Sequence, residues 1–331
     1  MSVTSLGLHP MSDADRKKLL NQLFKIDSWQ YSKCLADPGT PCPLPAIRAH
    51  SVQNARSLDL LARDGHVVAL TRRLDATNGP VIEFGDVGRN LATTFAGLCA
   101  QHDQTIFAPL DRLAFDPTNQ EHLFLAGYRA VIREFYATCA AASKVQTAYL
   151  ERVAAGLDPR DAPSPAGIVA TEHMMKAYET YLYKGEWDEA YAARDFGRVQ
   201  HDVIELNVAQ PTIAASALFT VHGAERAVGD MVRAALTVLP ISRVKTVAVF
   251  SYLPPDASPA RAVLQPVLTS TGDRQKYELS RRILNSCENF VIAPAYFDTW
   301  TDGKKRVVRE YFTRTILVEE MGYESPDLGL F

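Results

Sequence analysis

The chain has 331 residues, of which 47% are hydrophobic and 22% charged, and its formal net charge at pH 7 is −3. This size allows two ordinary domains with real cores, and the weak net charge excludes a global basic field that would by itself draw the protein onto nucleic acid. No apolar run approaches the roughly 18 to 20 residues needed to cross a bilayer, and the N-terminus lacks the basic-then-apolar order of a secretion signal. We therefore expect a cytoplasmic protein with no membrane partner.

The five cysteines are an odd number for a disulfide framework. In a reducing compartment thiols stay reduced, so this count favours metal binding over disulfides. Cys139 and Cys287 lie far from the other three in sequence, and we expect each to be a small buried apolar residue.

The chain opens with a predicted amphipathic helix over residues 11 to 26, behind a cap signal at Ser12 and Asp13. Its apolar residues recur at helical spacing: Leu19, Leu20, Leu23, Phe24 and Ile26. The next segment, "CLADPGTPCPLP" at residues 34 to 45, is rich in proline and glycine and predicts a loop or knuckle.

Short apolar pieces between residues 47 and 84, separated by the "ATNGP" turn, predict short strands or hairpins. Apolar residues of the following stretch recur at a spacing that predicts a short helix over residues 91 to 107. This helix would carry Cys99 and His102.

The second part of the chain begins with long helical patterns. Residues 120 to 156 show apolar positions three and four apart and predict one long helix. After a proline-rich loop, we expect a second helix over residues 168 to 184 and a short one over residues 187 to 195.

From residue 199 the apolar period shifts toward two, which predicts an antiparallel sheet. The expected strands lie at residues 199–208, 212–221, 244–253 and 261–270, and the expected helices at 224–236, 274–286 and 303–321. The sequence thus predicts an α+β fold in two parts. Residues 1–112 would form an N-terminal helix and a Cys/His module, and residues 113–331 a domain of helices packed on an antiparallel sheet.

Four residues of the first part form a candidate zinc site: Cys34, Cys42, Cys99 and His102. Structural zinc takes four cysteine or histidine ligands, usually as two short-spaced pairs. Cys99 and His102 are three apart, so both side chains point the same way from one helical turn. The prolines and glycine between Cys34 and Cys42 allow that segment to loop outward and return the second thiol. His50 and His66 remain alternatives for one of the four positions.

The order of "CLADPGTPC", "IRAHSVQ" and "NLATTFAGLCAQHD" resembles the HNH endonucleases, in which cysteine pairs hold a structural zinc within a treble-clef or ββα-metal module. The resemblance covers roughly residues 30 to 110, and the rest of the chain resembles uncharacterised bacterial proteins. It implies that His50 matches the strand histidine that activates water, that Asn90 matches the central asparagine, and that Asp103 takes the place of the helix metal ligand. In such enzymes Mg²⁺ or Mn²⁺ stabilises the charge that builds on the scissile phosphate.

The sequence also departs from the HNH pattern. Ala49 stands where many members place an acidic or second basic residue, and the second zinc pair is Cys-x2-His. We therefore expect a structural zinc module that binds nucleic acid, protein or a small ligand, and keep a metal-dependent nuclease using His50 and Asp103 as the alternative. The sequence leaves the oligomeric state open.

A further pair of cations, Arg129 and Arg133, lies four residues apart on the predicted long helix. They could hold an anion together, but a solvated charged helix face is the more common outcome of this pattern.

Overall fold

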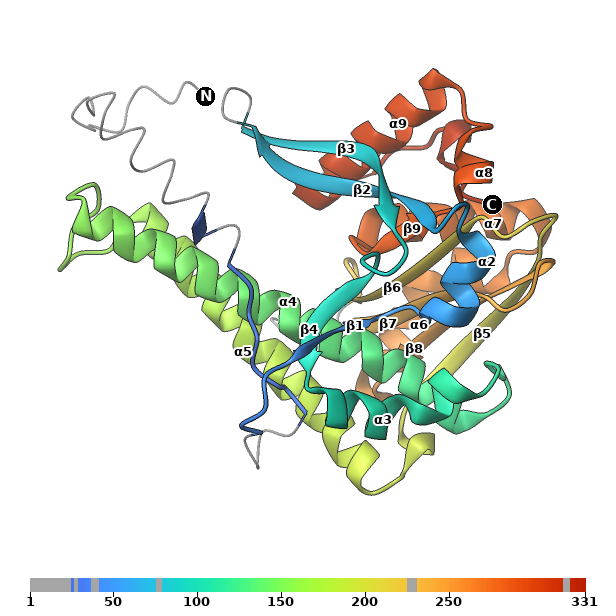
Figure 1. Cartoon of the computed structure of the whole chain (residues 1–331), viewed down its shortest axis with the longest axis horizontal. Coiled ribbons are helices and arrows are strands. Elements are labelled where there is room, and N and C mark those ends of the chain that lie inside the picture. Colours follow the sequence, from blue (N-terminus) through green and yellow to red (C-terminus); the bar gives the residue numbers. More distant parts are fainter. Residues whose placement is uncertain (1–24, 27–28, 37–41, 76–78, 225–230, 318–321) are drawn as a thin grey trace.

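Figure 1 shows the computed structural model of the chain. The residues whose structure is described fall into six ranges. They are residues 25–26, 29–36, 42–75, 79–224, 231–317 and 322–331. Lys25 and Ile26 are helical, and the rest of the helix predicted over residues 11 to 26 lies outside the described residues. Among the described residues, no helix is long and apolar enough to span a bilayer.

The fold is α+β, as the sequence predicts, and is organised around a large antiparallel sheet. In the described part of the chain this sheet has seven strands in the order β3-β2-β9-β6-β7-β8-β5. Their bounds are β2 His66–Asp75, β3 Gly79–Gly88, β5 Gln200–Asn207, β6 Ile213–Thr220, β7 Arg233–Pro240, β8 Lys245–Tyr252 and β9 Phe290–Ile292. A separate two-stranded sheet pairs β1 (Ile47–His50) with β4 (Thr94–Leu98).

Helices cover both faces of the large sheet. The longer ones are α3 Ala100–Arg112, α4 Gln120–Ala154, α5 Pro165–Ala192, α6 Pro254–Thr269, α7 Gly272–Ser286 and α9 Asp302–Phe312. Short ones are α2 Asp59–Leu61, α8 Pro294–Phe297 and the turns Asn54–Leu58, Phe196–Arg198, Thr313–Leu317 and Pro326–Leu328. On β8, Val247 and Val249 pack with Leu123 of α4, whereas Ala248 and Phe250 join the core under α6 and α7. Because side chains alternate along a strand, α4 and the α6–α7 pair lie on opposite faces.

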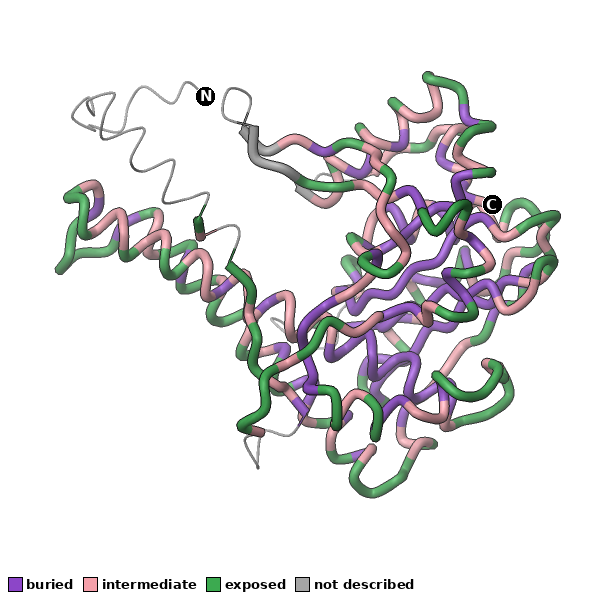
Figure 2. The backbone as a smooth tube through the Cα atoms, in the orientation of Figure 1, coloured by how far each residue is buried: buried purple, intermediate pink, exposed green. Residues whose placement is uncertain are grey.

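The helices α4 and α5 form an antiparallel hairpin whose far half extends away from the sheet (Figure 1). We call residues 135 to 182, the part that leaves the body, the arm. Burial is concentrated around the sheet and at the near end of the hairpin, and it thins along the arm (Figure 2). Trp187 is fully buried at the near end and stacks on Tyr128 of α4 with parallel rings 6.4 Å apart.

The sequence elements near α5 and β4 differ from the predictions. The two helices expected at 168–184 and 187–195 are one helix, α5, which passes through Gly185 because Trp187 and Ala190 are buried beyond it. Residues 94 to 98, expected within a helix, form β4, and α3 begins only at Ala100.

Two predictions in the second half are also wrong. Of the strand expected at 261–270, residues 261–269 belong to α6, whose buried residues Ala257, Ala260, Leu264 and Val267 follow helical spacing. The helix expected at 224–236 is wrong at its C-terminal end, because β7 begins at Arg233 and is buried along its whole length, and residues 225–230 lie outside the described residues. A short apolar run buried on both faces fits a helix and a strand equally well.

The large sheet joins residues from both parts of the chain. Val68 of β2 pairs with Ile292 of β9, and Ile292 pairs in turn with Ile213 of β6. Strands on either side of residue 112 therefore share one hydrogen-bonded sheet.

Candidate metal centre

The candidate metal centre begins where β4 passes into α3. Cys99 is the N-cap residue of α3, and its Sγ accepts a hydrogen bond from the backbone N–H of His102 at 3.5 Å. The side chains of Cys99 and His102 thus lie on the first turn of the helix and face the same point. The sequence prediction placed both residues inside a helix, and the structure places them at its start.

The proline-rich loop, which we call the knuckle (residues 33–45), is closed at its base and fastened to β4. Lys33 and Pro45 form an isolated antiparallel bridge, and the N–H of Ala46 donates to the carbonyl of Ser32 at 2.8 Å. The N–H of Leu35 donates to the carbonyl of Gly97 in β4, also at 2.8 Å. These contacts return both knuckle cysteines, despite their wide spacing, to the end of β4.

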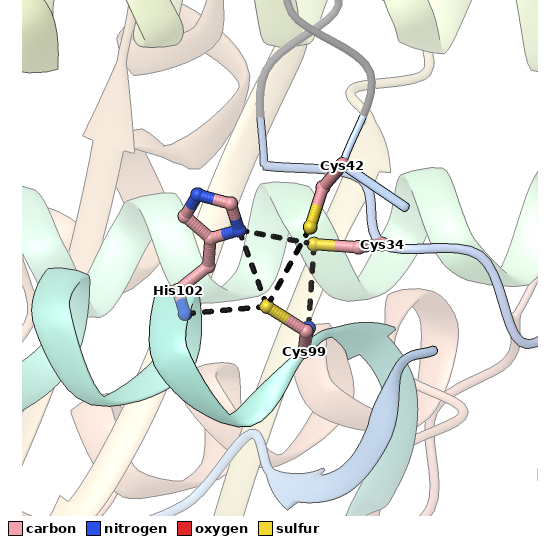
Figure 3. Close-up of side chains that lie close together, drawn as sticks. All are labelled: Cys34, Cys42, Cys99 and His102. Atoms are coloured by element: carbon pink, nitrogen blue, oxygen red, sulfur yellow. Dashed lines mark hydrogen bonds between the residues drawn. The ribbon is translucent and has the colours of Figure 1, made fainter. Parts of the chain in front are cut away.

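Cys34, Cys42, Cys99 and His102 meet in one cluster, with their ligand atoms all within 4.8 Å of one another (Figure 3). The Sγ atoms of Cys42 and Cys99 lie 3.8 Å apart. His102 Nδ1 lies 3.4 Å from the Sγ of Cys34 and 3.3 Å from that of Cys99.

These separations match the edges of a metal tetrahedron. Bonds of about 2.3 Å to sulfur and about 2.0–2.1 Å to nitrogen, the usual zinc values, give S–S edges of about 3.8 Å and S–N edges of about 3.5 Å. The cluster could therefore hold a metal ion, with three sulfurs and one nitrogen as ligands. The part of the chain that the structure describes places neither His50 nor His66 in this set.

The surroundings of Cys99 favour its thiolate, the form that binds metal. Desolvation raises the pKa of Cys99. A hydrogen bond from the backbone N–H of His102 and contacts with the thiols of Cys42 and Cys34 outweigh it and lower the pKa below its usual value. The start of a helix also favours negative charge. Burial raises the pKa of the neighbouring Cys34.

A buried ion pair holds the knuckle against the near end of the helical hairpin. The Nζ of Lys184 on α5 donates to the carbonyl of Ala36 at 3.5 Å and to both carboxylate oxygens of Asp188 at 2.7 Å. Tyr128 of α4 donates its hydroxyl to the same carboxylate at 2.5 Å. Lys184 is only 1% exposed. This cluster is not among the sites predicted from the sequence, although a lysine and an aspartate four residues apart on one helix often form an ion pair.

Two of the residues implied by the HNH resemblance lie around a second ion pair, in which the arginine is buried and the aspartate exposed. Arg129 of α4 is 4% exposed and bonds both oxygens of Asp111 on α3, at 3.0 and 2.8 Å. Burial and the nearby Arg129 guanidinium lower the pKa of His50. Burial raises the pKa of Asp103, against the opposing field of the same guanidinium. His50 and Asp103 are therefore both within electrostatic reach of Arg129.

The third residue implied by the resemblance, Asn90, lies in an exposed turn after β3. Its Oδ1 accepts a hydrogen bond from Asn54 Nδ2 at 3.0 Å. His66 is also exposed and holds its Nδ1 2.9 Å from the carbonyl of Asp64. Neither contact involves the Cys/His cluster or the Arg129–Asp111 pair.

The solvated charged face expected for Arg129 and Arg133 is wrong for Arg129. Its guanidinium lies 4.0 Å from the centre of the Phe107 ring and is shielded from water by the packing of α3 on α4. The carboxylate of Asp111 neutralises the buried charge, which is the condition for keeping an arginine in such a place.

No family model, curated protein or solved structure matches this chain. The residues of the site and their geometry are therefore the basis on which a function is argued.

Proposed function

We propose that Cys34, Cys42, Cys99 and His102 bind a structural Zn²⁺ and that the protein is a binding module acting through contacts with another protein. The observation that carries the zinc proposal is the convergence of four ligand atoms from the knuckle and from the start of α3 within 4.8 Å. A Cys3His set is a common structural zinc site, and soft thiolates select zinc over Mg²⁺ or Ca²⁺.

The ligand set supports a structural role for the metal. Four protein ligands complete a tetrahedron, whereas catalytic zinc keeps one position for water or substrate. The metal would join two segments far apart in sequence, the knuckle and the β4–α3 junction. The knuckle in turn contacts Lys184, so the bound ion would fix the near end of the helical hairpin.

A protein partner is favoured over nucleic acid by the surface of the arm. Large apolar side chains of α5, including Met174, Met175 and Tyr178, are about half exposed there. Contiguous exposed apolar surface marks interaction sites. The net charge of −3 supplies no general attraction for a polyanion.

Metal analysis of protein purified without added metal tests the zinc proposal. We expect about one zinc per chain, and a loss of most of it in Cys42→Ser. Cys139→Ser is the matched control, because Cys139 lies on α4 outside the cluster, and it should keep its zinc. Metal-free wild-type protein that folds normally would refute the proposal.

A metal-dependent nuclease is the second candidate. It is favoured by the order strand, strand, helix of β1, β4 and α3, and by the nearness of His50 and Asp103 to one ion pair. A general base needs a neutral imidazole, and the lowered pKa of His50 favours the neutral ring.

The test of this candidate is cleavage of plasmid DNA with Mg²⁺ or Mn²⁺. His50→Ala and Asp103→Ala should abolish cleavage while zinc content is unchanged, and His66→Ala, an exposed histidine outside the site, should not affect it. Wild-type protein that cleaves no DNA with either ion would exclude the nuclease.

A further inference from the structure

The three sulfurs of the Cys/His cluster make different contacts (Figure 3). The Sγ of Cys42 lies 3.8 Å from the Sγ of Cys99, which is a direct contact between two sulfur atoms. The Sγ of Cys34 instead accepts a hydrogen bond from the backbone N–H of Cys99 at 3.3 Å and lies 3.4 Å from His102 Nδ1. A disulfide between Cys42 and Cys99 would need their sulfurs to approach by less than about 2 Å.

The sulfurs also differ in their access to solvent. Cys99 is only 1% exposed. Cys42 is partly exposed, and residues 43–45, which follow it, are exposed. Cys34 is also partly exposed, but it packs against the apolar core formed by α3, α4 and α5. An oxidant that diffuses in from water therefore has its least obstructed approach at Cys42, and Cys99 is the buried sulfur in contact with it.

We propose that the zinc site is controlled by oxidation: a peroxide converts Cys42 and Cys99 into a disulfide, and the zinc is released. This inference rests on the proposed zinc site, whose regulation it describes. In the first step the thiolate of Cys42 attacks one oxygen of hydrogen peroxide. The O–O bond breaks, the sulfur becomes a sulfenic acid, and hydroxide leaves.

The second step joins the two sulfurs. The thiolate of Cys99 attacks the Sγ of Cys42, the S–S bond forms, and the S–O bond breaks to release a second hydroxide. The two thiolates together lose two electrons, and the peroxide becomes two water molecules after the uptake of two protons. An excess of a dithiol reductant returns both thiolates by exchange, so the change is reversible.

Oxidation removes two of the four metal ligands. Cys34 and His102 remain, whereas a structural zinc needs four ligands, and a disulfide sulfur is no longer a thiolate. The carbonyl of Ala36, two residues beyond Cys34, accepts a hydrogen bond from Lys184 Nζ at 3.5 Å. Loss of the metal therefore loosens the limb of the knuckle that contacts the near end of the helical hairpin, while the disulfide keeps the limb of Cys42 attached to α3.

The test uses the full chain, purified without added metal and then freed of reductant. Hydrogen peroxide is added, zinc release is followed with a coloured chelator, and the cysteines are assigned by alkylation and peptide mass spectrometry. We expect release of the bound zinc, a disulfide between Cys42 and Cys99, and alkylation of Cys34. Dithiothreitol and Zn²⁺ together should restore the bound metal. Cys139→Ser should behave as the wild type, because Cys139 lies outside the cluster.

A matched pair of variants separates this disulfide from general oxidation. Cys42→His and Cys34→His each keep four zinc ligands, because imidazole nitrogen also binds zinc. Cys42→His lacks the sulfur that joins Cys99 and should release zinc about tenfold more slowly than the wild type. Cys34→His keeps both sulfurs of the proposed disulfide and should release zinc at the wild-type rate.

Zinc content before oxidation tests the zinc site, and the peptide map tests the switch. Protein without zinc that still forms the disulfide between Cys42 and Cys99 would refute the zinc site and leave the sulfur pairing standing. Zinc-loaded wild type that keeps its metal in peroxide, a disulfide that contains Cys34, or equal rates of release from the two histidine variants would each overturn the switch. If neither histidine variant binds zinc, the peptide map of the wild type decides.

Discussion

The central sheet and the knuckle differ in how much apolar surface they bury. All eight residues of β7 are buried, and its side chains contribute to the cores on both faces of the sheet. Of the knuckle residues that the structure describes, only Ala36 is buried. The sheet is thus held by burial of apolar surface, whereas the knuckle has too little apolar surface to order its backbone unaided. Under the proposed function, the zinc would supply to the knuckle the stabilisation that the hydrophobic core supplies to the sheet.

Removal of zinc should have the largest effect, and it should be confined to one region. Structural zinc contributes on the order of 10 kcal/mol in small modules, so a chelator should release the knuckle while the sheet persists. In hydrogen exchange, the amides of Leu35 and Ala46 should lose protection, and those of Leu236 and Val238 in β7 should keep it. Equal loss in both regions would show that the sheet also depends on the metal.

A cavity in the sheet should destabilise the sheet and leave the zinc site of the knuckle intact. Leu236 is fully buried in β7, so Leu236→Ala should lower the free energy of unfolding by about 2–5 kcal/mol. Urea titration measures this change, and metal analysis should still find about one zinc per chain. Loss of zinc from folded Leu236→Ala would contradict the separation of the two regions.

Protonation of His201 in acid should lower the free energy of unfolding, by less than the cavity at Leu236 does. Burial lowers the pKa of His201 to about 4, and its Nδ1 lies 2.8 Å from the Oγ of Ser251 on the neighbouring strand. The folded state therefore favours the neutral ring. The stabilisation is complete above the unfolded pKa of about 6.5 and is lost as the pH falls from there toward 4.

Between pH 6.5 and 5 this loss should amount to about 2 kcal/mol. Urea titrations at the two pH values measure it, with His201→Gln as the control that should lack this part of the pH dependence. An identical pH dependence in both proteins would show that His201 is not its source.

The smallest effect is expected for an exposed ion pair that connects the two halves of the chain. Arg63 and Asp298 lie 2.5 Å apart, but both side chains are more than half exposed. Water screens such a pair, so Arg63→Ala should not measurably shift the midpoint of thermal unfolding. A clear decrease of the unfolding midpoint would mean that this ion pair, in addition to the pairing of β2 with β9, holds the two halves of the chain together.

The sequence predicted those features that depend on local chemistry. The four residues of the cluster were identified from residue type and spacing, and α4 from its long apolar periodicity, which the structure places at Gln120–Ala154. The strands β5, β6 and β8 were also found, because each combines β-branched and apolar residues between turn signals.

Features that depend on tertiary contacts could not be predicted from the sequence. An arginine on a helix is expected at the surface. Arg129 can be buried because Asp111, from another helix, neutralises its charge. The sequence predicted two helices, at 168–184 and 187–195, and the burial of Trp187 explains why α5 continues between them. The pairing of β2 with β9 joins residues more than two hundred positions apart, and no local pattern encodes it.

X-ray absorption at the zinc edge is the most direct test of the central claim, that a Cys3His zinc centre orders the knuckle. On protein purified without added metal, we predict a first shell of three sulfurs at about 2.3 Å and one nitrogen at about 2.0–2.1 Å. A shell dominated by oxygen or nitrogen, or the absence of zinc from folded protein, would contradict it.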